Sequence, residues 1–286
     1  MSKHFLKSIP EELRVNVKEV VDYITLRLRH YILDYANRNK YVIGLSGGVD
    51  SSVTTYLAVK SLGPRNVHVL LLPSNSTPKQ DIEDAYGVIN FLNIPKENVA
   101  YIEIDEIVDE FSNMLGVKDS LGVGNIKARV RMIILHGYAH KVKGLVLGTG
   151  DKSEITIGYF TKYGDSGVDV LPIGDLYKTQ VRQIAAEVRL PERIYIKPPS
   201  PALWQGQTAE GELGIDYLTL DRILYRKMEL WMNDEEISKE LNIPIATVEK
   251  ITNMIKNSQH KRLPPEIFKI GFRSHGSDWR YPREWK

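Results

Sequence analysis

The chain has 286 residues, of which 42% are hydrophobic and 26% are charged, and its formal net charge is +2. This length and composition are typical of a globular protein with a sizeable core, and they exclude fibrous and disordered classes. The small net charge gives no argument for a nucleic-acid partner. Without a long apolar run or a cleavable leader, we expect a cytoplasmic protein with no membrane partner. The absence of cysteine excludes disulfides, thiolate metal sites and a cysteine nucleophile.

The first predicted element is a long amphipathic helix at the N-terminus. Apolar residues recur through residues 10–39 with the spacing of one helix face. Because this helix precedes the first predicted strand, we expect it to cover a sheet or a partner subunit.

Short apolar strands then alternate with helices. The strands are predicted at residues 41–45, 67–72, 99–104 and 145–147, and the helices near residues 50–62, 78–92, 105–114 and 124–142. This alternation predicts an α/β fold, a doubly wound parallel sheet with helices on both faces. Ligands of such sheets bind beyond the carboxyl ends of the strands.

The second half of the chain has a different pattern. Residues 152–201 are rich in Gly, Pro and Asp, which predicts long ligand-facing loops before a helix at residues 178–189. From residue 211 onward the pattern is helical, and it ends in a basic tail. We therefore expect a single domain over residues 1–286, made of an N-terminal helix (1–40), a nucleotide-binding core (41–210) and a helical C-terminal part (211–286).

One stretch of the C-terminal part resembles a helix-turn-helix. In residues 233–255 two short apolar patterns are separated by a turn. The second helix offers Thr247, Glu249 and Lys250 where a DNA-binding helix would carry a row of Arg or Lys. A helical hairpin that completes the core is therefore favoured over a nucleic-acid interface.

The most informative string is LSGGVDSSV at residues 45–53. A strand that ends at Leu45, the glycines Gly47 and Gly48, and a helix that begins near Asp50 bring backbone N–H groups and a helix N-terminus to one point. The serines of the string add hydroxyl donors. The string is neither a Walker A loop nor a GxGxxG motif. An isolated SGG would more often be a simple capped turn, but the whole string after the first strand favours a phosphate site.

This string resembles the pyrophosphate loop of the N-type ATP pyrophosphatases, enzymes that split ATP to adenylate a substrate. The resemblance implies the adenine nucleotide alpha hydrolase-like fold. Further strings follow in order. They are GNIKARVRM at 124–132, GTGDKSE at 148–154, FTKYGDSGVDVLPIGDLYKTQVR at 160–182, PPSPALWQGQTAEGELG at 198–214 and HKR at 260–262. Each string alone has a plainer explanation, such as solvated charges on a helix. In this shared order they resemble NAD synthetase over nearly the whole chain.

The resemblance implies a ligase that completes NAD biosynthesis. The carboxylate of nicotinic acid adenine dinucleotide (deamido-NAD) attacks the α-phosphorus of ATP, pyrophosphate leaves, and ammonia displaces AMP from the acyl adenylate. Because a carboxylate must approach a polyanion, the site should supply Mg²⁺, lysines and backbone donors. Glutamine-using relatives carry an additional amidohydrolase domain with a cysteine nucleophile. This chain has neither the length nor a cysteine, so free ammonia is the expected nitrogen source. The resemblance also implies a homodimer.

Individual roles follow from the same resemblance. Catalysis is assigned to Asp50, Glu154 and Lys178, and Mg²⁺ to Asp50 and Glu154. The residues expected to contact ATP are Gly44, Leu45, Ser46, Gly47, Gly48, Val49, Asp50, Ser51, Thr149, Lys178 and Ser200. The residues expected to contact deamido-NAD are Arg129, Lys162, Asp169, His260 and Lys261. One departure is Asp151, which stands where the family string usually carries Asn.

Two other functions stay open at this point. The first is a nucleotide-binding module without turnover, which would be free to lose Glu154 and Lys178, although both are present. The second is another adenylating ATP pyrophosphatase. Relatives that make GMP or argininosuccinate share the loop, but they do not match the FTKYGD and QGQT strings, and tRNA-thiolating relatives rely on cysteines.

Overall fold

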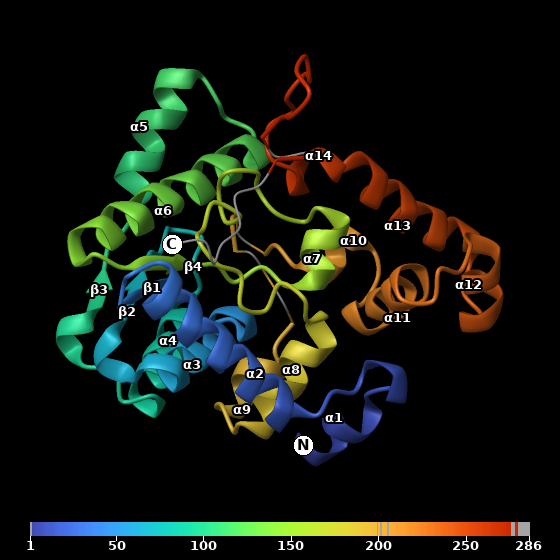
Figure 1. The fold of residues 1–286 in the computed structure, drawn as a ribbon, viewed down its shortest axis with the longest axis horizontal. Helices are drawn as coiled ribbons and strands as arrows, with labels where there is room; N and C mark the ends of the chain where they lie inside the picture. Colours follow the sequence, from blue (N-terminus) through green and yellow to red (C-terminus); the bar gives the residue numbers. More distant parts are fainter. Residues whose placement is uncertain (1, 199, 201, 205, 276–277, 280–286) are drawn as a thin grey trace.

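The computed structural model describes residues 2–198, 200, 202–204, 206–275 and 278–279 (Figure 1). Three positions of the PPSPALWQGQT string and the end of the predicted basic tail, 280–286, therefore lie outside the described residues. Within the described ranges, no helix combines the length and apolar character needed to cross a membrane.

The predicted strands form one parallel sheet in the order β3-β2-β1-β4. Their bounds are β1 (Tyr41–Gly44), β2 (Val67–Leu71), β3 (Val99–Tyr101) and β4 (Leu145–Leu147). Tyr41 lies opposite Val67 of β2 and Leu145 of β4, so the central strand is paired on both sides. All carboxyl ends open at one edge of the sheet, which places the loops after β1, β2 and β4 side by side.

The helices lie on both faces of the sheet and beyond its β4 side, as a doubly wound α/β fold requires (Figure 1). Their bounds are α1 (Ser2–Ser8), α2 (Val17–His30), α3 (Val49–Leu62), α4 (Lys79–Phe91), α5 (Asp105–Leu115), α6 (Ser120–Val142), α7 (Lys152–Ile157), α8 (Lys178–Glu187), α9 (Glu192–Ile196), α10 (Ala209–Leu213), α11 (Tyr217–Met228), α12 (Asp234–Leu241), α13 (Ile245–Asn257) and α14 (Gln259–Arg262), with short 3₁₀ turns η1 (Glu11–Leu13), η3 (Pro64–Asn66) and η4 (Lys96–Asn98).

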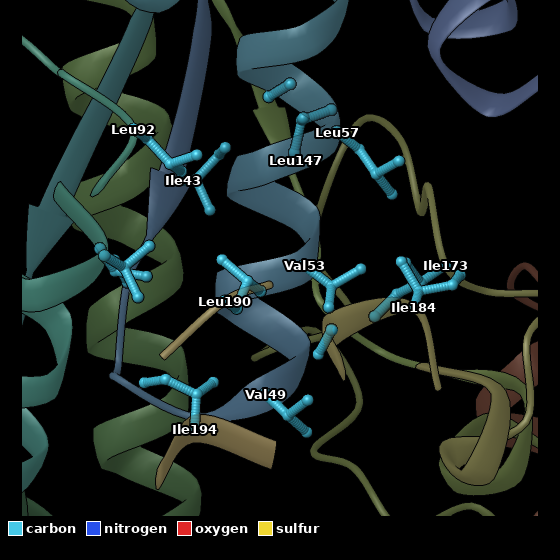
Figure 2. Packing of buried hydrophobic residues seen from close by; sticks show 14 of the residues in the cluster. Ile43, Val49, Val53, Leu57, Leu92, Leu147, Ile173, Ile184, Leu190 and Ile194 are labelled. Carbon is cyan, nitrogen blue, oxygen red and sulfur yellow. The ribbon is translucent and has the colours of Figure 1, made fainter. Parts of the chain in front are cut away.

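The alternating side chains of β1 separate two apolar layers. Tyr41 and Ile43 pack with α2, α3 and α8, whereas Val42 packs with α5 and α6 on the other face. Figure 2 shows the first layer, with Val53 of α3 and Ile184 of α8 among its labelled side chains. All five side chains are fully buried, so the sheet is a rigid base for the loops at its carboxyl edge.

The N-terminal helix is shorter than the predicted span of residues 10–39. The side chain of Asn16 accepts a hydrogen bond from the backbone N–H of Glu19, which starts α2 at Val17. A π-helical segment η2 (Tyr31–Tyr35) continues it, and Asn37 leaves the helix in a left-handed conformation (φ 54°). The buried face of α2 packs in the layer around β1, so this helix covers the sheet of its own subunit.

Two further predictions were wrong in detail. Asp119 caps α6, so the helix begins at Ser120 instead of near the predicted residue 124, and this places Arg129 and Arg131 near its middle. The region predicted as long loops, 152–201, contains α7 and α9. In α7 the reason is a second capping aspartate, Asp151, which accepts a hydrogen bond from the backbone of the third helical residue.

The C-terminal helices form a second apolar core, to the right in Figure 1. Residues 233–255 are the predicted hairpin of α12 and α13, and Ile237, Val248 and Ile251 from it are fully buried in this core. Ile157 of α7 also belongs to the core. The core therefore supports the back of α7, a helix that carries one of the predicted catalytic residues.

Candidate active site

The loop after β1 has the geometry of an anion cradle. Gly47 has φ 77°, and Gly48 is the N-cap of α3, so the chain turns sharply from strand to helix. The hydroxyl of Ser51 lies 3.2 Å from the backbone nitrogen of Ser46, and Ser52 Oγ donates to the carbonyl of Gly48 at 2.7 Å. These bonds fix the loop and leave the positive end of the α3 dipole at the carboxyl edge of the sheet.

Gly47→Ala is expected to destabilise the fold strongly. A Cβ at Gly47 would lie 2.1 Å from the carbonyl oxygen of Asp81, and the left-handed backbone itself costs about 1–2 kcal/mol for a residue with a Cβ. We expect a loss of about 3 kcal/mol in the free energy of unfolding, measured by urea titration. Gly48→Ala is the control, because Gly48 has φ −81° and its Cβ would meet Ser46 Oγ at 3.3 Å. Equal effects of the two substitutions would contradict this explanation.

Lys178 lies at the centre of a buried carboxylate cluster. Its side chain is completely buried, and Nζ lies 2.8 Å from Asp50 Oδ2, from Asp151 Oδ2 and from Glu154 Oε1. Asp50 comes from the first turn of α3, Asp151 and Glu154 come from the start of α7, and Lys178 is the first residue of α8. The structure thus brings together the predicted set Asp50, Glu154 and Lys178, and it adds Asp151.

Burial shapes the charge of this cluster. It raises the pKa of Asp151 to about 7 and that of Glu154 to about 8, against the opposing effect of the Lys178 charge. Burial alone would lower the pKa of Lys178, but Asp151, Asp50 and Glu154 together raise it well above its ordinary value. One ammonium therefore faces three carboxylates, and the cluster has an excess of negative charge when all are ionised.

The donor set fits a hard divalent cation shared with a ligand. Asp50 Oδ1 is buried and has no hydrogen-bond partner among the described residues. In the described part of the chain, no group of three His, Asp or Glu side chains forms a preformed metal site. Within the cluster, the ammonium of Lys178 lies between the carboxylates. Mg²⁺ commonly takes only one or two protein carboxylates and completes its shell with phosphate oxygens and water. Asp50 and Glu154, each 21% exposed, suit that role.

A helix of the C-terminal part, α11, packs against the Lys178 cluster. The ring of Tyr217 in α11 lies 5.0 Å from Lys178 Nζ, and its hydroxyl donates to Glu154 Oε1 at 3.4 Å. One turn later, Asp221 contacts α7 and the first turn of α8. Sequence analysis missed Tyr217 and Asp221, because in the amino-acid pattern they are ordinary members of an amphipathic helix.

Four of the five residues predicted to hold the dinucleotide lie around one loop. Arg129 Nη2 donates to the carbonyl of Lys162 at 3.2 Å, and Lys162 Nζ donates to the carbonyl of His260 at 2.8 Å. Lys261 Nζ donates to the backbone of the same loop, at residues 158 and 160. The fifth residue, Asp169, has a different setting, because its Oδ2 accepts the backbone N–H of Val146 at 2.7 Å beside β4.

The remaining predicted ATP contacts lie on loops at the same edge. Thr149 lies two residues after the end of β4. Ser200 is exposed, and its hydroxyl donates to the carbonyl of Gln207 at 2.6 Å within its own loop. That loop is tied down by a residue that sequence analysis missed, Lys127 of α6, which is only 5% exposed and donates to the carbonyl of Leu203 at 3.0 Å. The sequence feature that could have identified Lys127 is its position in the GNIKARVRM string.

Comparison with known proteins agrees with this geometry. Residues 20–265 match the family model described as NAD synthase. Over 277 residues the chain is 54% identical to the NH(3)-dependent NAD(+) synthetase of Sulfurisphaera tokodaii and 55% identical to that of Saccharolobus solfataricus, in each case with 97% of this chain and 98% of the relative covered.

Solved structures give the same result. The NMN synthetase from Francisella tularensis matches with a TM-score of 0.77 at 33% identity, over 92% of this chain and 100% of that one. The NH3-dependent NAD synthetase from Campylobacter jejuni matches with a TM-score of 0.74 at 27% identity, over 89% and 100%. The span matched by the family model contains the phosphate loop, the Lys178 cluster and Lys261. The chain therefore belongs to the NAD synthase family.

Proposed function

We propose that this protein amidates deamido-NAD with ammonia to give NAD, using ATP and releasing AMP and pyrophosphate. The observation that carries the proposal is the buried Lys178 cluster beside the phosphate loop, in a chain 54% identical to an NH(3)-dependent NAD(+) synthetase. The reaction has two steps. A substrate carboxylate oxygen bonds to the α-phosphorus as pyrophosphate leaves, and ammonia then bonds to the acyl carbon as AMP leaves and the nitrogen loses a proton.

The residues of the loop and the cluster have complementary roles in this proposal. Gly44 to Ser51 surround the ATP phosphates, with donors from the loop and the α3 N-terminus directed at oxygen. Lys178 supplies a positive charge next to the departing pyrophosphate, and Thr149 and Ser200 complete the ATP site. Because Asp151 caps α7 and contacts Lys178, it orients Glu154 and Lys178, two of the three catalytic side chains of the cluster.

We assign Mg²⁺ to Asp50 and Glu154. When bound, the ion would neutralise charge on the phosphate oxygens and stabilise the pyrophosphate as it leaves. The excess of carboxylates over cations in the cluster and the unpartnered Asp50 Oδ1 support this assignment. No protein nucleophile is needed, because the substrate carboxylate is itself the attacking group.

Arg129, Lys162, Asp169, His260 and Lys261 are the proposed dinucleotide contacts. Lys261→Ala is expected to raise the KM for deamido-NAD about 10-fold with a smaller change in the KM for ATP, because it removes a cation from the loop at residues 158–162. Steady-state kinetics with each substrate varied in turn measures this. Lys256→Ala, on the exposed face of α13, is the control. An effect confined to ATP would place Lys261 in the other subsite.

We also propose that two copies associate. The interface proposed is the outer face of α5 and α6, which exposes large apolar side chains. They are Phe111, Met114, Leu115, Leu121 and Ile133, with exposed fractions of 38, 71, 62, 65 and 58%. An apolar face of this kind is typical of subunit contacts. The mass of the protein in solution tests the association.

The whole chain is proposed to act as one catalytic domain. Ile157 of α7 and Tyr177 before α8 are buried in the same core as the C-terminal helices. The catalytic helices of the 41–210 core therefore depend for their position on the helices α10 to α13.

The deciding experiment uses the pure protein with ATP and Mg²⁺. Ammonium is compared with glutamine, and deamido-NAD with nicotinic acid mononucleotide, because one structural neighbour is named NMN synthetase. We expect NAD from deamido-NAD with ammonium and none with glutamine. Amidation of the mononucleotide alone would move the substrate assignment, and ATP binding without either product would support a silent nucleotide-binding module.

A further inference from the structure

One buried carboxylate beside the Lys178 cluster has no role in the reaction so far. Asp221 lies in the middle of α11 and is completely buried. Its Oδ1 accepts a hydrogen bond from Ser153 Oγ at 2.5 Å, and its Oδ2 accepts one from the backbone N–H of Thr179 at 2.8 Å. Ser153 belongs to α7 and Thr179 to α8, so a single carboxylate joins both helices to α11.

The bonded atoms are immediate neighbours of the catalytic residues. Ser153 precedes Glu154, and Thr179 follows Lys178. The hydroxyl of Ser153 also accepts the backbone N–H of Lys178 at 2.9 Å. The first two N–H groups of α8, which have no partner inside the helix, are therefore bonded to Ser153 and Asp221.

The same face of α11 contacts the catalytic side chains. Tyr217 lies one turn before Asp221, with its ring 5.0 Å from Lys178 Nζ and its hydroxyl 3.4 Å from Glu154 Oε1. Residues four apart on a helix lie on one face, so Tyr217 supports the side chains while Asp221 holds the backbone behind them. A buried carboxylate at a helix N-terminus also interacts favourably with the helix dipole.

We propose that Asp221 is a positioning residue for the reaction, which fixes α7 and α8 to each other so that Glu154 and Lys178 stay in register with Asp50. This inference rests on the proposed function. In the proposed reaction α7 carries a magnesium ligand and α8 carries the lysine beside the pyrophosphate, so a small shift of either helix lengthens the contact between the ammonium and its carboxylates. The hydrogen bonds of Asp221 go to Ser153 and the α8 backbone and not to the cluster side chains, so it acts through these two partners.

The test compares Asp221→Asn with wild-type protein. The Asn side chain keeps one acceptor but directs an NH₂ group at a donor, either Ser153 O–H or Thr179 N–H. We expect kcat to fall about 30-fold while the KM for deamido-NAD stays within about twofold, because the loop around Lys162 and Lys261 is not disturbed. Equilibrium binding of ATP, which requires no turnover, should weaken by about threefold to 10-fold.

Two further variants separate positioning from simple stabilisation. Asp234→Asn removes a carboxylate that accepts Thr252 Oγ1 at 2.9 Å and pairs with Lys227, within the same C-terminal helices but away from α7 and α8. It should lower Tm without changing kcat. Ser153→Ala breaks the link from Asp221 to Lys178 and should give an intermediate loss of kcat, and it remains informative if Asp221→Asn does not fold.

Each outcome has a defined meaning. A kcat of Asp221→Asn within twofold of wild type, at a temperature where both are folded, overturns the proposal, and so does an equal loss in Asp234→Asn. The proposed function is tested separately, by measuring whether the wild-type protein forms NAD from ammonium. If it does not, the ratio of ATP affinities between Asp221→Asn and wild type still decides whether Asp221 positions the site.

Discussion

Lys178→Met is expected to lower NAD formation by about 10³-fold, because it removes the ammonium that contacts Asp50, Asp151 and Glu154 and that we place beside the departing pyrophosphate. Methionine replaces the apolar stem of the side chain and lacks only the terminal ammonium, so most of the pocket stays filled. The rate of NAD formation at saturating substrates measures the effect. Lys152→Met is the control, since Lys152 pairs with Glu229 at 2.7 Å on another face of α7. Comparable losses in both variants would contradict a special role for Lys178.

The same variant should have a pH-dependent stability defect. The folded-state pKa values of Asp151 and Glu154 are raised to about 7 and about 8, so both acids hold a proton in the folded protein at pH 6. A raised folded pKa gives stability that is present at low pH and lost as pH rises through that value. Below about pH 7, removal of the lysine leaves mostly neutral acids. Because the Lys178 charge opposes the rise in these two pKa values, its removal raises them further. As pH rises past about 8, the variant must therefore keep protons that wild type releases or hold unpaired buried carboxylates, at a cost of up to about 3–5 kcal/mol.

Urea unfolding at pH 6 and pH 8.5 checks this linkage. The difference in free energy of unfolding between wild type and Lys178→Met should be small at pH 6 and large at pH 8.5. A difference that does not change with pH would mean that the acids of the cluster are ionised throughout this range.

Asp50→Asn is the second substitution with a large expected effect. We expect turnover to fall by about 10²–10³-fold, since the amide cannot supply the anionic ligand that we assign to Mg²⁺. The fold should be retained, with a change in free energy of unfolding within about 1 kcal/mol, because the cluster already has more carboxylates than cations and Asn preserves the shape.

NAD formation over a Mg²⁺ titration, together with thermal unfolding, measures this prediction. Asp22→Asn serves as control, because Asp22 is a half-exposed carboxylate of α2 that pairs with Lys60 at 2.7 Å, away from the site. Normal activity of Asp50→Asn in Mg²⁺ would refute the metal assignment. A collapsed fold would show instead that the ion pair with Lys178 is primarily structural.

Sequence alone predicted the βα order, the sheet and the phosphate loop, because these depend on local chemistry. The alternation of Tyr41, Val42 and Ile43 and the pair Gly47 and Gly48 are patterns of adjacent residues that admit few conformations. The ends of helices were predicted less well. Asp119 and Asp151 are capping residues, and their effect on α6 and α7 depends on a single side-chain hydrogen bond that a periodic pattern does not contain.

The family resemblance predicted roles for Asp50, Glu154 and Lys178, but it gave no physical reason for their side chains to be in contact. They come from the first turns of α3, α7 and α8, and their contact requires the parallel sheet to bring the loops after β1 and β4 to one edge. The motif did not predict the role of Asp151, which stands where the family usually has Asn. Its contact with Lys178 is visible only in the folded chain.

Tyr217 and Asp221 were decided by tertiary structure alone. They lie about 40 to 70 residues from their partners in α7 and α8, on a helix whose amino-acid pattern is that of ordinary core packing. Sequence therefore predicted which residues carry the chemistry proposed for the reaction. The packing of α11 against α7 and α8 decided which further residues hold them in place. A buried carboxylate can accept hydrogen bonds from two helices only when both helices are folded and packed against its own helix.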